Sequence, residues 1–424
     1  MPRLNQHMTH LEDLVLLGKD GLDELTDKIE KFIGSIENNM NSILASVKID
    51  GAPAVVVWSK FKDYPDNSIC LKSFLTSNKN CLSSVADIEE KYGSRPDMAE
   101  KLKYCLELSR SIPPWQAWQG DCLYSKSDLK ESEINGTKYI TFHPNKIVYA
   151  FSEENAPYED IKKSNFGICF HTIYTGDLEH KTQSFNVDSS RLTNIPDGIF
   201  VMSPVLNYSK NPDDYHLIEI KEKFSKLKDL KTSLLSDPVY KELVENNSFI
   251  SFWNRFENNA IADKKSVTIN KSTFITDLLD FIQEKLKAEL DKKIASAKTE
   301  RGVQSAKNRY DSSIFELDNL IMNSKDTLNL IVDSINTAAE IKMLMLGGYK
   351  KSVLDYNTFY KHKEQGYIPT DMEGVALSTQ DGEVVKLVDR TTFSNANRDQ
   401  NYLSGFIHEG LISEDFTSFS SYDD

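Results

Sequence analysis

The fold is predicted around one stretch of the chain, Lys48-Ile49-Asp50-Gly51-Ala52-Pro53-Ala54-Val55-Val56-Val57-Trp58. It places a lysine two residues before an Asp-Gly pair, ahead of a run of β-branched residues typical of a buried strand. Glycine tolerates positive φ and aspartate can hydrogen-bond its own backbone, so Asp-Gly favours a tight turn. A lysine held on such a turn can lose part of its hydration and act as a nucleophile. The alternative is an ordinary hairpin turn with a solvent-facing lysine.

Length and composition are those of an ordinary globular chain. With 424 residues, 39% hydrophobic and 27% charged, the sequence allows two domains or one large domain with an insertion. No apolar run approaches the ~18 residues of a membrane span. The start Met1–His10 is polar and does not have the pattern expected of a signal peptide. The five cysteines include no Cys-x-x-Cys pair, which predicts free thiols in a reducing cytoplasm and neither disulfides nor a zinc site.

The net charge of −14 argues against a protein that coats nucleic acid through a globally basic surface. It leaves room for a local basic groove. It also fits an enzyme that acts on small substrates or on the ends of a polymer.

Strand patterns come early and late in the chain, and a helical pattern lies between them. Strands are expected within 43–58, 68–76, 115–124, 139–151, 166–174, 198–202, 371–378 and 383–387, and helices within 8–46, 84–110 and 215–350, with 271–309 as one long helix. We therefore predict an α+β fold with an antiparallel-rich core. Its parts are a first core segment at 1–204, a helical insertion or cap at 205–350, the last core strands at 351–410 and an acidic tail at 411–424.

Four charged elements follow one another in the order lysine, carboxylate, carboxylate, lysine. They are Lys48 before Asp50-Gly51, Gly120-Asp121 in a strand, Glu373-Gly374-Val375 in a strand, and Lys386 in the strand that follows. Covalent nucleotidyl transfer needs such a set. One lysine attacks the α-phosphorus of a nucleotide, a second offsets charge on the phosphate, a carboxylate holds a metal ion, and another polar group fixes the ribose.

These motifs resemble those of the covalent nucleotidyltransferases, the superfamily of ATP-dependent DNA ligases, RNA ligases and mRNA capping enzymes. Lys48-Ile49-Asp50-Gly51 resembles motif I, which implies that Lys48 accepts AMP. Gly120-Asp121 resembles motif III, with Asp121 at the ribose. Glu373-Gly374-Val375 resembles motif IV, with Glu373 near the metal. The segment around Lys386 resembles motif V, with that lysine on the α-phosphate.

Two further matches are weaker. Phe166–Thr172 resembles motif IIIa, whose aromatic residue stacks on the base; we favour Phe170, with Tyr149 as runner-up and core packing as the alternative for Phe170. Lys72 is the best match to the arginine of motif Ia. The lysine in place of that arginine is one of three departures from the family pattern. Motif III has Asp for the usual Glu, and the second lysine of motif V is Val388, for which Arg390 is the candidate replacement.

The resemblance implies an ATP-grasp-like ligase core that uses ATP and Mg²⁺. Residues 387–424 are too few for the OB-fold domain of about 100 residues that DNA ligases and capping enzymes carry. In this respect the chain resembles RNA ligases that pair the catalytic core with a helical domain. The binding cleft is expected between the sheet that carries Lys48 and the sheet that carries Glu373.

We therefore expect an ATP-dependent polynucleotide ligase that joins 5′-phosphate and 3′-hydroxyl ends through lysyl-AMP, with RNA favoured over DNA as in RNA repair. Lysines of the helical block are candidates for contact with phosphates, although such a face on an acidic protein is more often simply solvated: Lys221, Lys223, Lys226, Lys228, Lys231, Lys285, Lys287, Lys292, Lys293 and Lys298.

Two alternatives stay open. One is a DNA ligase or a nucleotidyltransferase with another acceptor. The other is a non-catalytic interaction protein that kept the fold and works through its helical block, which the loss of the second motif V lysine favours. The whole chain also resembles uncharacterised proteins of large tailed phages, and that resemblance implies its origin more than its activity. It lies in Thr9–Asp13, Lys48–Pro53, Lys386–Arg390 and Phe393-Ser394.

Overall fold

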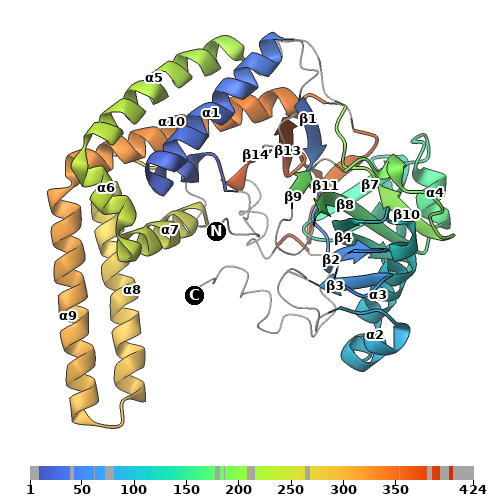
Figure 1. The fold of residues 1–424 in the computed structure, drawn as a ribbon, viewed down its shortest axis with the longest axis horizontal. Coiled ribbons are helices and arrows are strands. Elements are labelled where there is room, and N and C mark those ends of the chain that lie inside the picture. The colour runs from blue at the N-terminus through green and yellow to red at the C-terminus, as the bar shows by residue number, and fades with distance from the viewer. Residues whose placement is uncertain are drawn as a thin grey trace.

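The computed structural model describes residues 9–38, 43–61, 63–71, 81–176, 182–185, 187–207, 215–262, 268–352, 354–379, 384–391 and 401–403. Within them the chain has a mixed α+β fold, as predicted, and its strands form three largely antiparallel sheets. The two larger sheets lie at one side of the molecule and the long helices lie at the other (Figure 1).

The smallest sheet joins an early strand to the last two strands. β1 (Ile43–Val47) pairs antiparallel with β13 (Gly374–Thr379), which pairs antiparallel with β14 (Val384–Val388). The two strands predicted at 371–387 are thus confirmed as an antiparallel pair, and their connection at 380–383 lies outside the described residues. The sheet brings together segments more than 300 residues apart in the chain.

The six-stranded sheet has the order β10-β8-β4-β2-β3, with β9 paired to β8. Its pairs are antiparallel except β10 with β8. The strands are β2 (Ala54–Trp58), β3 (Ser68–Leu71), β4 (Gln116–Ser125), β8 (Phe166–Thr175), β9 (Thr182–Phe185) and β10 (Ile199–Met202).

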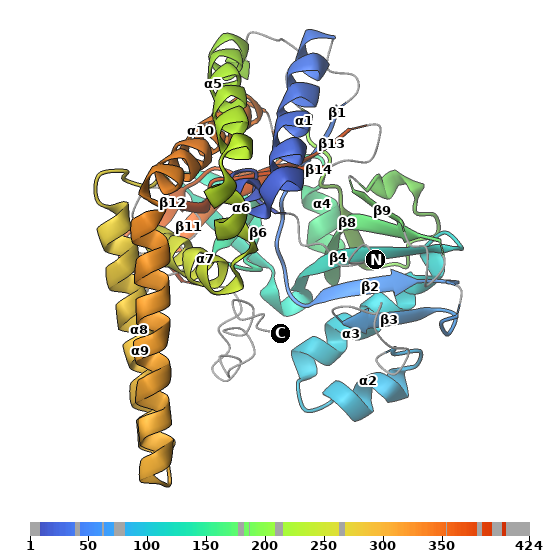
Figure 2. The same cartoon turned by 60° about the vertical axis from the view of Figure 1, so that its left-hand side comes forward.

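Two helices, α2 (Val85–Tyr92) and α3 (Pro96–Leu108), cover one face of this sheet (Figure 2). Ser84 begins α2 with a capping box in which its hydroxyl accepts from the Asp87 amide at 3.1 Å. Apolar side chains of both helices and of alternate strand positions form a separate buried core, which includes Val55, Leu102 and Phe170. The helices predicted within 84–110 are therefore confirmed.

A five-stranded antiparallel sheet has the order β12-β11-β7-β6-β5. Its strands are β5 (Lys130–Ile134), β6 (Thr137–Phe142), β7 (Ile147–Ser152), β11 (Asn357–His362) and β12 (Gly366–Pro369). The short helix α4 (Tyr158–Lys163) follows β7, and 3-10 turns lie at η4 (Ser109–Ser111), η5 (Lys126–Asp128) and η6 (Ser189–Arg191). β5, β11 and β12 are not among the predicted strands.

The helical part of the molecule is built around α10 (Lys325–Lys350), most of whose apolar side chains are buried. It packs on η1 (Glu12–Leu17), on α5 (Leu217–Ser236) and on β14. α1 (Gly18–Glu37) packs on α5 with its predicted apolar face buried: Leu22, Leu25, Ile29, Phe32, Ile33 and Ile36. The N-terminal helices thus share one core with the inserted helices.

The remaining helices are α6 (Pro238–Glu245), α7 (Asn247–Ala262), α8 (Phe274–Ser296) and α9 (Glu300–Asn323). The prediction of one long helix over 271–309 is wrong, because α8 and α9 form a hairpin whose turn lies at 297–299. Thr299 adopts an extended conformation there and caps α9 by accepting from the Gly302 amide at 3.1 Å. Among the helices that the structure describes, none has both the length and the apolar character needed to cross a bilayer.

Candidate functional site

Lys48 lies where the smallest sheet ends. β1 stops at Val47, which stands opposite Val375 of β13, and the Lys48 amide donates to the Gly374 carbonyl at 2.9 Å. Glu373 directly precedes β13 and therefore comes to the same end of the sheet. Backbone pairing between the two strands thus places Lys48 beside Glu373, although they are separated by 325 residues.

The Lys48 ammonium contacts two carboxylates, those of Asp50 and Glu373. The exposed fractions of the three side chains are 23% for Lys48, 40% for Asp50 and 2% for Glu373, so the lysine is reachable from solvent while one partner is buried. The expected cleft between a Lys48 sheet and a separate Glu373 sheet is corrected by this arrangement. Both residues stand on the same sheet.

Residues 48–53 cross from this sheet to the six-stranded sheet, so β1 and β2 are not a hairpin. The crossing is fixed on β4, where the Ala52 amide donates to the Cys122 carbonyl at 2.9 Å. A Cβ at Gly51 would lie 2.2 Å from that carbonyl oxygen, which explains the glycine. Asn145 fixes the same crossing by donating from Nδ2 to the Asp50 carbonyl at 2.8 Å. The predicted rigid support of the lysine is therefore supplied by neighbouring strands.

Gly120 and Asp121 lie within β4, as predicted. A Cβ at Gly120 would lie 2.4 Å from the Cys169 carbonyl oxygen of β8, so the neighbouring backbone approaches too closely for a side chain. The Asp121 carboxylate faces His171, with 3.6 Å between Oδ2 and Nε2. Asp121 is 13% exposed, and its charge interacts with those of Asp50, Lys48 and Glu373. It therefore belongs to the same cluster.

The pKa values of the clustered groups are shifted by burial and by the charges of their neighbours. Burial and then the charge of Asp50 raise the pKa of Glu373 to about 8. Burial, again followed by Asp50, raises the pKa of Asp121 well above its ordinary value. Burial disfavours the charged form of Lys48, but Glu373 and Asp50 outweigh it and raise the pKa of the ammonium. The Lys48 side chain is therefore protonated.

Lys386 stands on β14, opposite Ala376 of β13, and forms a β-bridge with His10. Its side chain is half-buried. Burial and then the charge of Lys48 lower the pKa of Lys386, with opposing contributions from Glu373 and Asp50. The second predicted lysine is therefore within electrostatic range of the first, on the same small sheet.

The interpretation of Phe170 as the base-stacking residue is corrected by the structure. Its ring is fully buried under α2 and α3 and meets the Trp118 ring edge-on, with 5.5 Å between centroids. Side chains alternate along β8, so the next residue, His171, points to the opposite face and reaches Asp121. Tyr149, the runner-up, is also buried and stacks on Phe142.

Two other predicted residues do not join the cluster. Lys72 lies outside the described residues. Arg390, the candidate replacement for a second motif V lysine, instead binds Asp13 at 2.9 Å and Glu257 at 3.2 Å in the helical part of the molecule. Val388 is buried. Arg390 is therefore a structural residue of another cluster, which corrects its predicted role.

Sequence reasoning missed His171 and Asn145 as neighbours of the lysine. The histidines form no cluster with ligand spacing, so nothing in the sequence marks His171 as a site residue. Burial lowers its pKa to about 4, so it is neutral. Asn145 acts through the backbone of Asp50, which no sequence spacing indicates. The strand alternation around Phe170 is the signal that could have pointed to His171.

Only part of the cluster is suited to a metal ion. Within the described residues no group of three or more His, Cys, Asp or Glu side chains is arranged to hold one. Mg²⁺, however, is commonly bound through one or two carboxylates together with substrate phosphates. Glu373 Oε2 is buried and has no hydrogen-bond partner. That orphaned oxygen fits the single protein ligand predicted at Glu373.

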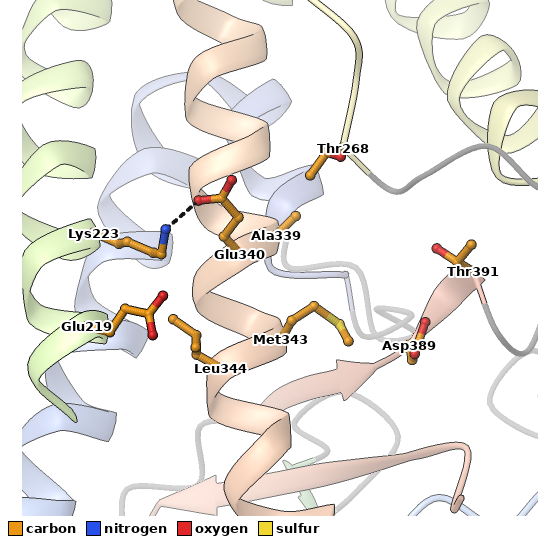
Figure 3. A pocket seen from close by; sticks show the side chains of 9 residues that line it. All are labelled: Glu219, Lys223, Thr268, Ala339, Glu340, Met343, Leu344, Asp389 and Thr391. Atoms are coloured by element: carbon orange, nitrogen blue, oxygen red, sulfur yellow. Dashed lines mark hydrogen bonds and ion pairs between the residues drawn. The ribbon is translucent and has the colours of Figure 1, made fainter. Parts of the chain in front are cut away.

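An open pocket of about 430 Å³ lies elsewhere, between α5 and α10 (Figure 3). Lys223 and Glu340 form an ion pair of 2.7 Å at its edge. Its lining consists of Glu219, Lys223, Thr268, Ala339, Glu340, Met343, Leu344, Asp389 and Thr391. None of the residues around Lys48 lines it, so this pocket is separate from the lysine cluster.

Comparison with protein families assigns the chain to one family. Residues 5–401 match a family described as a family of unknown function (DUF6267), and the chain belongs to that family. Comparisons with curated proteins and with solved structures find no match.

Proposed function

We propose that the protein is an ATP-dependent nucleotidyltransferase of the ligase type, with Lys48 as the nucleophile. The observation that carries the proposal is the contact of the Lys48 amine with Asp50 and Glu373, the latter brought from the other end of the chain. A partly exposed amine at a rigid strand end, beside excess carboxylates and a second lysine, has the components of this chemistry.

In the first step the neutral Lys48 amine attacks the α-phosphorus of ATP. A P–N bond forms, the P–O bond to pyrophosphate breaks, and the departing pyrophosphate takes the electron pair. The amine must first lose a proton. Burial opposes the charged form of Asp50, but Lys48 outweighs it and lowers its pKa, so the Asp50 carboxylate is the ionised acceptor in contact with the amine. Glu373, also in contact, becomes an acceptor as the pH approaches its raised pKa of about 8. Lys386 offsets charge that develops on the phosphate oxygens. Mg²⁺, when bound at Glu373, would shield the phosphates.

In the later steps AMP passes from Lys48 to a 5′-phosphate end, and a 3′-hydroxyl then displaces it to form the new phosphodiester. RNA ends are the acceptor that we favour, on the strength of the resemblance to RNA ligases. We assign the hydrogen bond from the ribose to Asp121, which is 13% exposed and interacts with the charge of Lys48.

The test is the intact mass of the protein after incubation with ATP and Mg²⁺. We expect a gain of one AMP, about 329 Da, that hydroxylamine or acid removes as a phosphoramidate. Lys48→Ala should show none. Lys60→Ala, at an exposed lysine just after β2, is the matched control and should be adenylylated normally. Absence of the adduct from the unaltered protein with ATP, GTP and NAD would refute the proposal.

A non-catalytic role is the second candidate. The observation that favours it is the raised pKa of Lys48, since an ammonium held by two carboxylates is also a plain structural ion pair. In that case Lys48→Ala would lower thermal stability strongly, and the unaltered protein would form no adduct.

A further inference from the structure

The outer half of the α8–α9 hairpin is an arm with little packing of its own. All the buried side chains of the two helices lie at the end next to the body: Phe274, Leu278, Phe281 and Ile282 in α8, and Leu317 and Ile321 in α9. Both views show the hairpin extending away from the sheets and from the other helices (Figures 1 and 2). Helices of 23 and 24 residues are about 35 Å long at 1.5 Å per residue. Core burial does not explain such a length.

The charge of this arm is opposite to that of the chain. Residues 285–309, which we call the basic arm, contain eight Lys or Arg and three Asp or Glu, a net charge of +5 on a chain of −14. The cations are Lys285, Lys287, Lys292, Lys293, Lys298, Arg301, Lys307 and Arg309. The positive charge is thus gathered on the part of the molecule that reaches furthest into solvent.

Most of these cations make no ion pair with the residues that the structure describes. Lys285 lies 3.1 Å from Glu284, and Arg255 of α7 pairs with Glu289 at 3.5 Å. In the part of the chain that the structure describes, the other seven cations of the arm make no ion pair, and their side chains are exposed. Like charges crowded in this way repel one another, and a polyanion would relieve that repulsion.

The apolar side chains of the basic arm lie in the seam between its two helices. Leu286, Leu290, Ile294 and Val303 are each partly buried, which is the exposure of a seam between two helices. No apolar face is left on these four to enter a lipid bilayer, as a membrane-bound amphipathic helix requires. The exposed chemistry of the arm is therefore a row of cations.

We infer that the basic arm binds the phosphate backbone of a nucleic acid. Cations along two antiparallel helices suit a linear polyanion, whose charges repeat along its length. The inference names the partner of the Lys48 site and rests on the proposed function for the reaction. The binding itself follows from the arm alone. The arm holds the polynucleotide, and the smallest sheet supplies the chemistry at its end.

The experiment measures fluorescence anisotropy of the full chain with labelled single-stranded RNA or DNA of about 30 nucleotides, at about 50–200 mM salt. The arm variant is K292E/K293E/K298E/K307E. The matched control is K130E/K138E/K163E/K241E, four exposed lysines on other elements with the same change in net charge. We expect at least tenfold weaker binding by the arm variant. Its log–log salt slope should be shallower by about 3, from four lost phosphate contacts.

Equal losses in the two variants, or no binding by the unaltered protein, would overturn the inference. Tighter binding of RNA than of DNA would identify the favoured acceptor, and the reverse order would identify DNA; either supports the arm as the binding surface. Binding is measured without ATP, and AMP adduct formation is measured without nucleic acid, each on the unaltered protein. A failure of adenylylation and a failure of binding are therefore distinguishable.

Discussion

Two clusters of charged side chains in this molecule have nearly the same composition. In the first, Lys48, Asp50 and Glu373 stand at the end of the smallest sheet, and Lys386 of β14 and Asp121 of β4 interact with their charges. In the second, Lys342 and Arg390 stand with Glu12, Asp13 and Glu257 where η1, α7 and α10 meet. Each has two cations and three carboxylates, and in each a lysine contacts a glutamate more than 300 residues away.

The clusters differ in their access to solvent. The Lys342 and Glu12 side chains are both 0% exposed, whereas Lys48 is 23% and Asp50 is 40% exposed. The Lys342–Glu12 pair is enclosed, with Asp13 at 27% exposure on the rim of its cluster, whereas the Lys48–Asp50 pair is open to solvent at the end of a strand. A buried ion pair is weak evidence of function in itself. Access of the central lysine to solvent therefore separates a candidate site from a structural cluster of the same charge.

The largest expected effect comes from Lys48→Arg. Arginine keeps the positive charge and both carboxylate partners, but its guanidinium cannot lose a proton in a protein and so cannot attack phosphorus. We expect AMP adduct formation to fall to background while the thermal midpoint changes little. Intact mass and calorimetry on the same sample measure both. An adduct on the Lys48→Arg variant would mean that another residue is the nucleophile.

Lys342→Met should give the reverse pattern. Removing one partner of a fully buried pair leaves Glu12 without its lysine, which typically costs about 3–5 kcal/mol of unfolding free energy. Denaturant unfolding measures this loss. The fraction of folded molecules that forms the AMP adduct should be unchanged.

The control for that variant is the double change Glu12→Gln/Lys342→Met. In Lys342→Met the buried Glu12 carboxylate keeps only Arg390, at 3.4 Å, as a cationic partner. A neutral amide removes that poorly compensated charge, so the double variant should be more stable than Lys342→Met alone. If the double variant is the less stable of the two, the pair is not the origin of the loss.

Glu373→Gln tests whether the buried carboxylate at the Lys48 cluster acts in the chemistry. The amide preserves the shape but loses the charge that contacts Lys48 and the orphaned Oε2 that suits Mg²⁺. We expect the rate of adduct formation to fall by about a hundredfold, the loss typical of one electrostatic group. Rapid-quench measurement over a range of Mg²⁺ concentrations gives the rate. A normal rate with normal Mg²⁺ dependence would remove Glu373 from the site.

The Lys342 cluster should make stability depend on pH. Burial and then the charge of Asp13 raise the pKa of Glu257 from 4.5 to about 8. Between these values the folded protein holds a proton that the unfolded chain has released. The free energy of unfolding therefore falls as pH rises from about 4.5 to about 8, by at most about 1.4 kcal/mol per pH unit. Glu257→Gln should make the curve shallower in this window, and Glu373, whose pKa is also raised to about 8, accounts for slope that remains. Urea unfolding at several pH values measures the change.

Much of the fold follows from local patterns in the sequence. The apolar spacing in α1 and the β-branched run in β2 predict their elements because each buries one face or both against a core. β5, with the sequence Lys-Glu-Ser-Glu-Ile, was missed because its largely exposed side chains carry no apolar alternation. The break between α8 and α9 was missed because it depends on one capping threonine within an otherwise helical pattern.

The candidate site was only partly predictable. The order of charged motifs indicated Lys48, Asp121, Glu373 and Lys386, and the structure gathers them. The choice between Phe170 and its neighbour depended on which face of β8 is covered by α2 and α3, and that is a property of the tertiary fold. The partners of Arg390 come from η1 and α7, segments that no motif connects to it.

Substitutions at two adjacent positions of β8 should have modest and opposite consequences for stability and nucleotide binding. Phe170→Leu removes part of a core side chain on the face away from Lys48, so it should cost about 1 kcal/mol of stability and leave the KM for ATP unchanged. His171→Ala, one residue along and on the Lys48 face, should raise that KM with a smaller change in stability, because the imidazole is partly exposed beside Asp121. Pyrophosphate-exchange kinetics and denaturant unfolding of the pair separate the two faces of β8. The reverse result, with KM raised by Phe170→Leu alone, would restore the phenylalanine as the base-stacking residue and place the nucleotide on the helical side of the sheet.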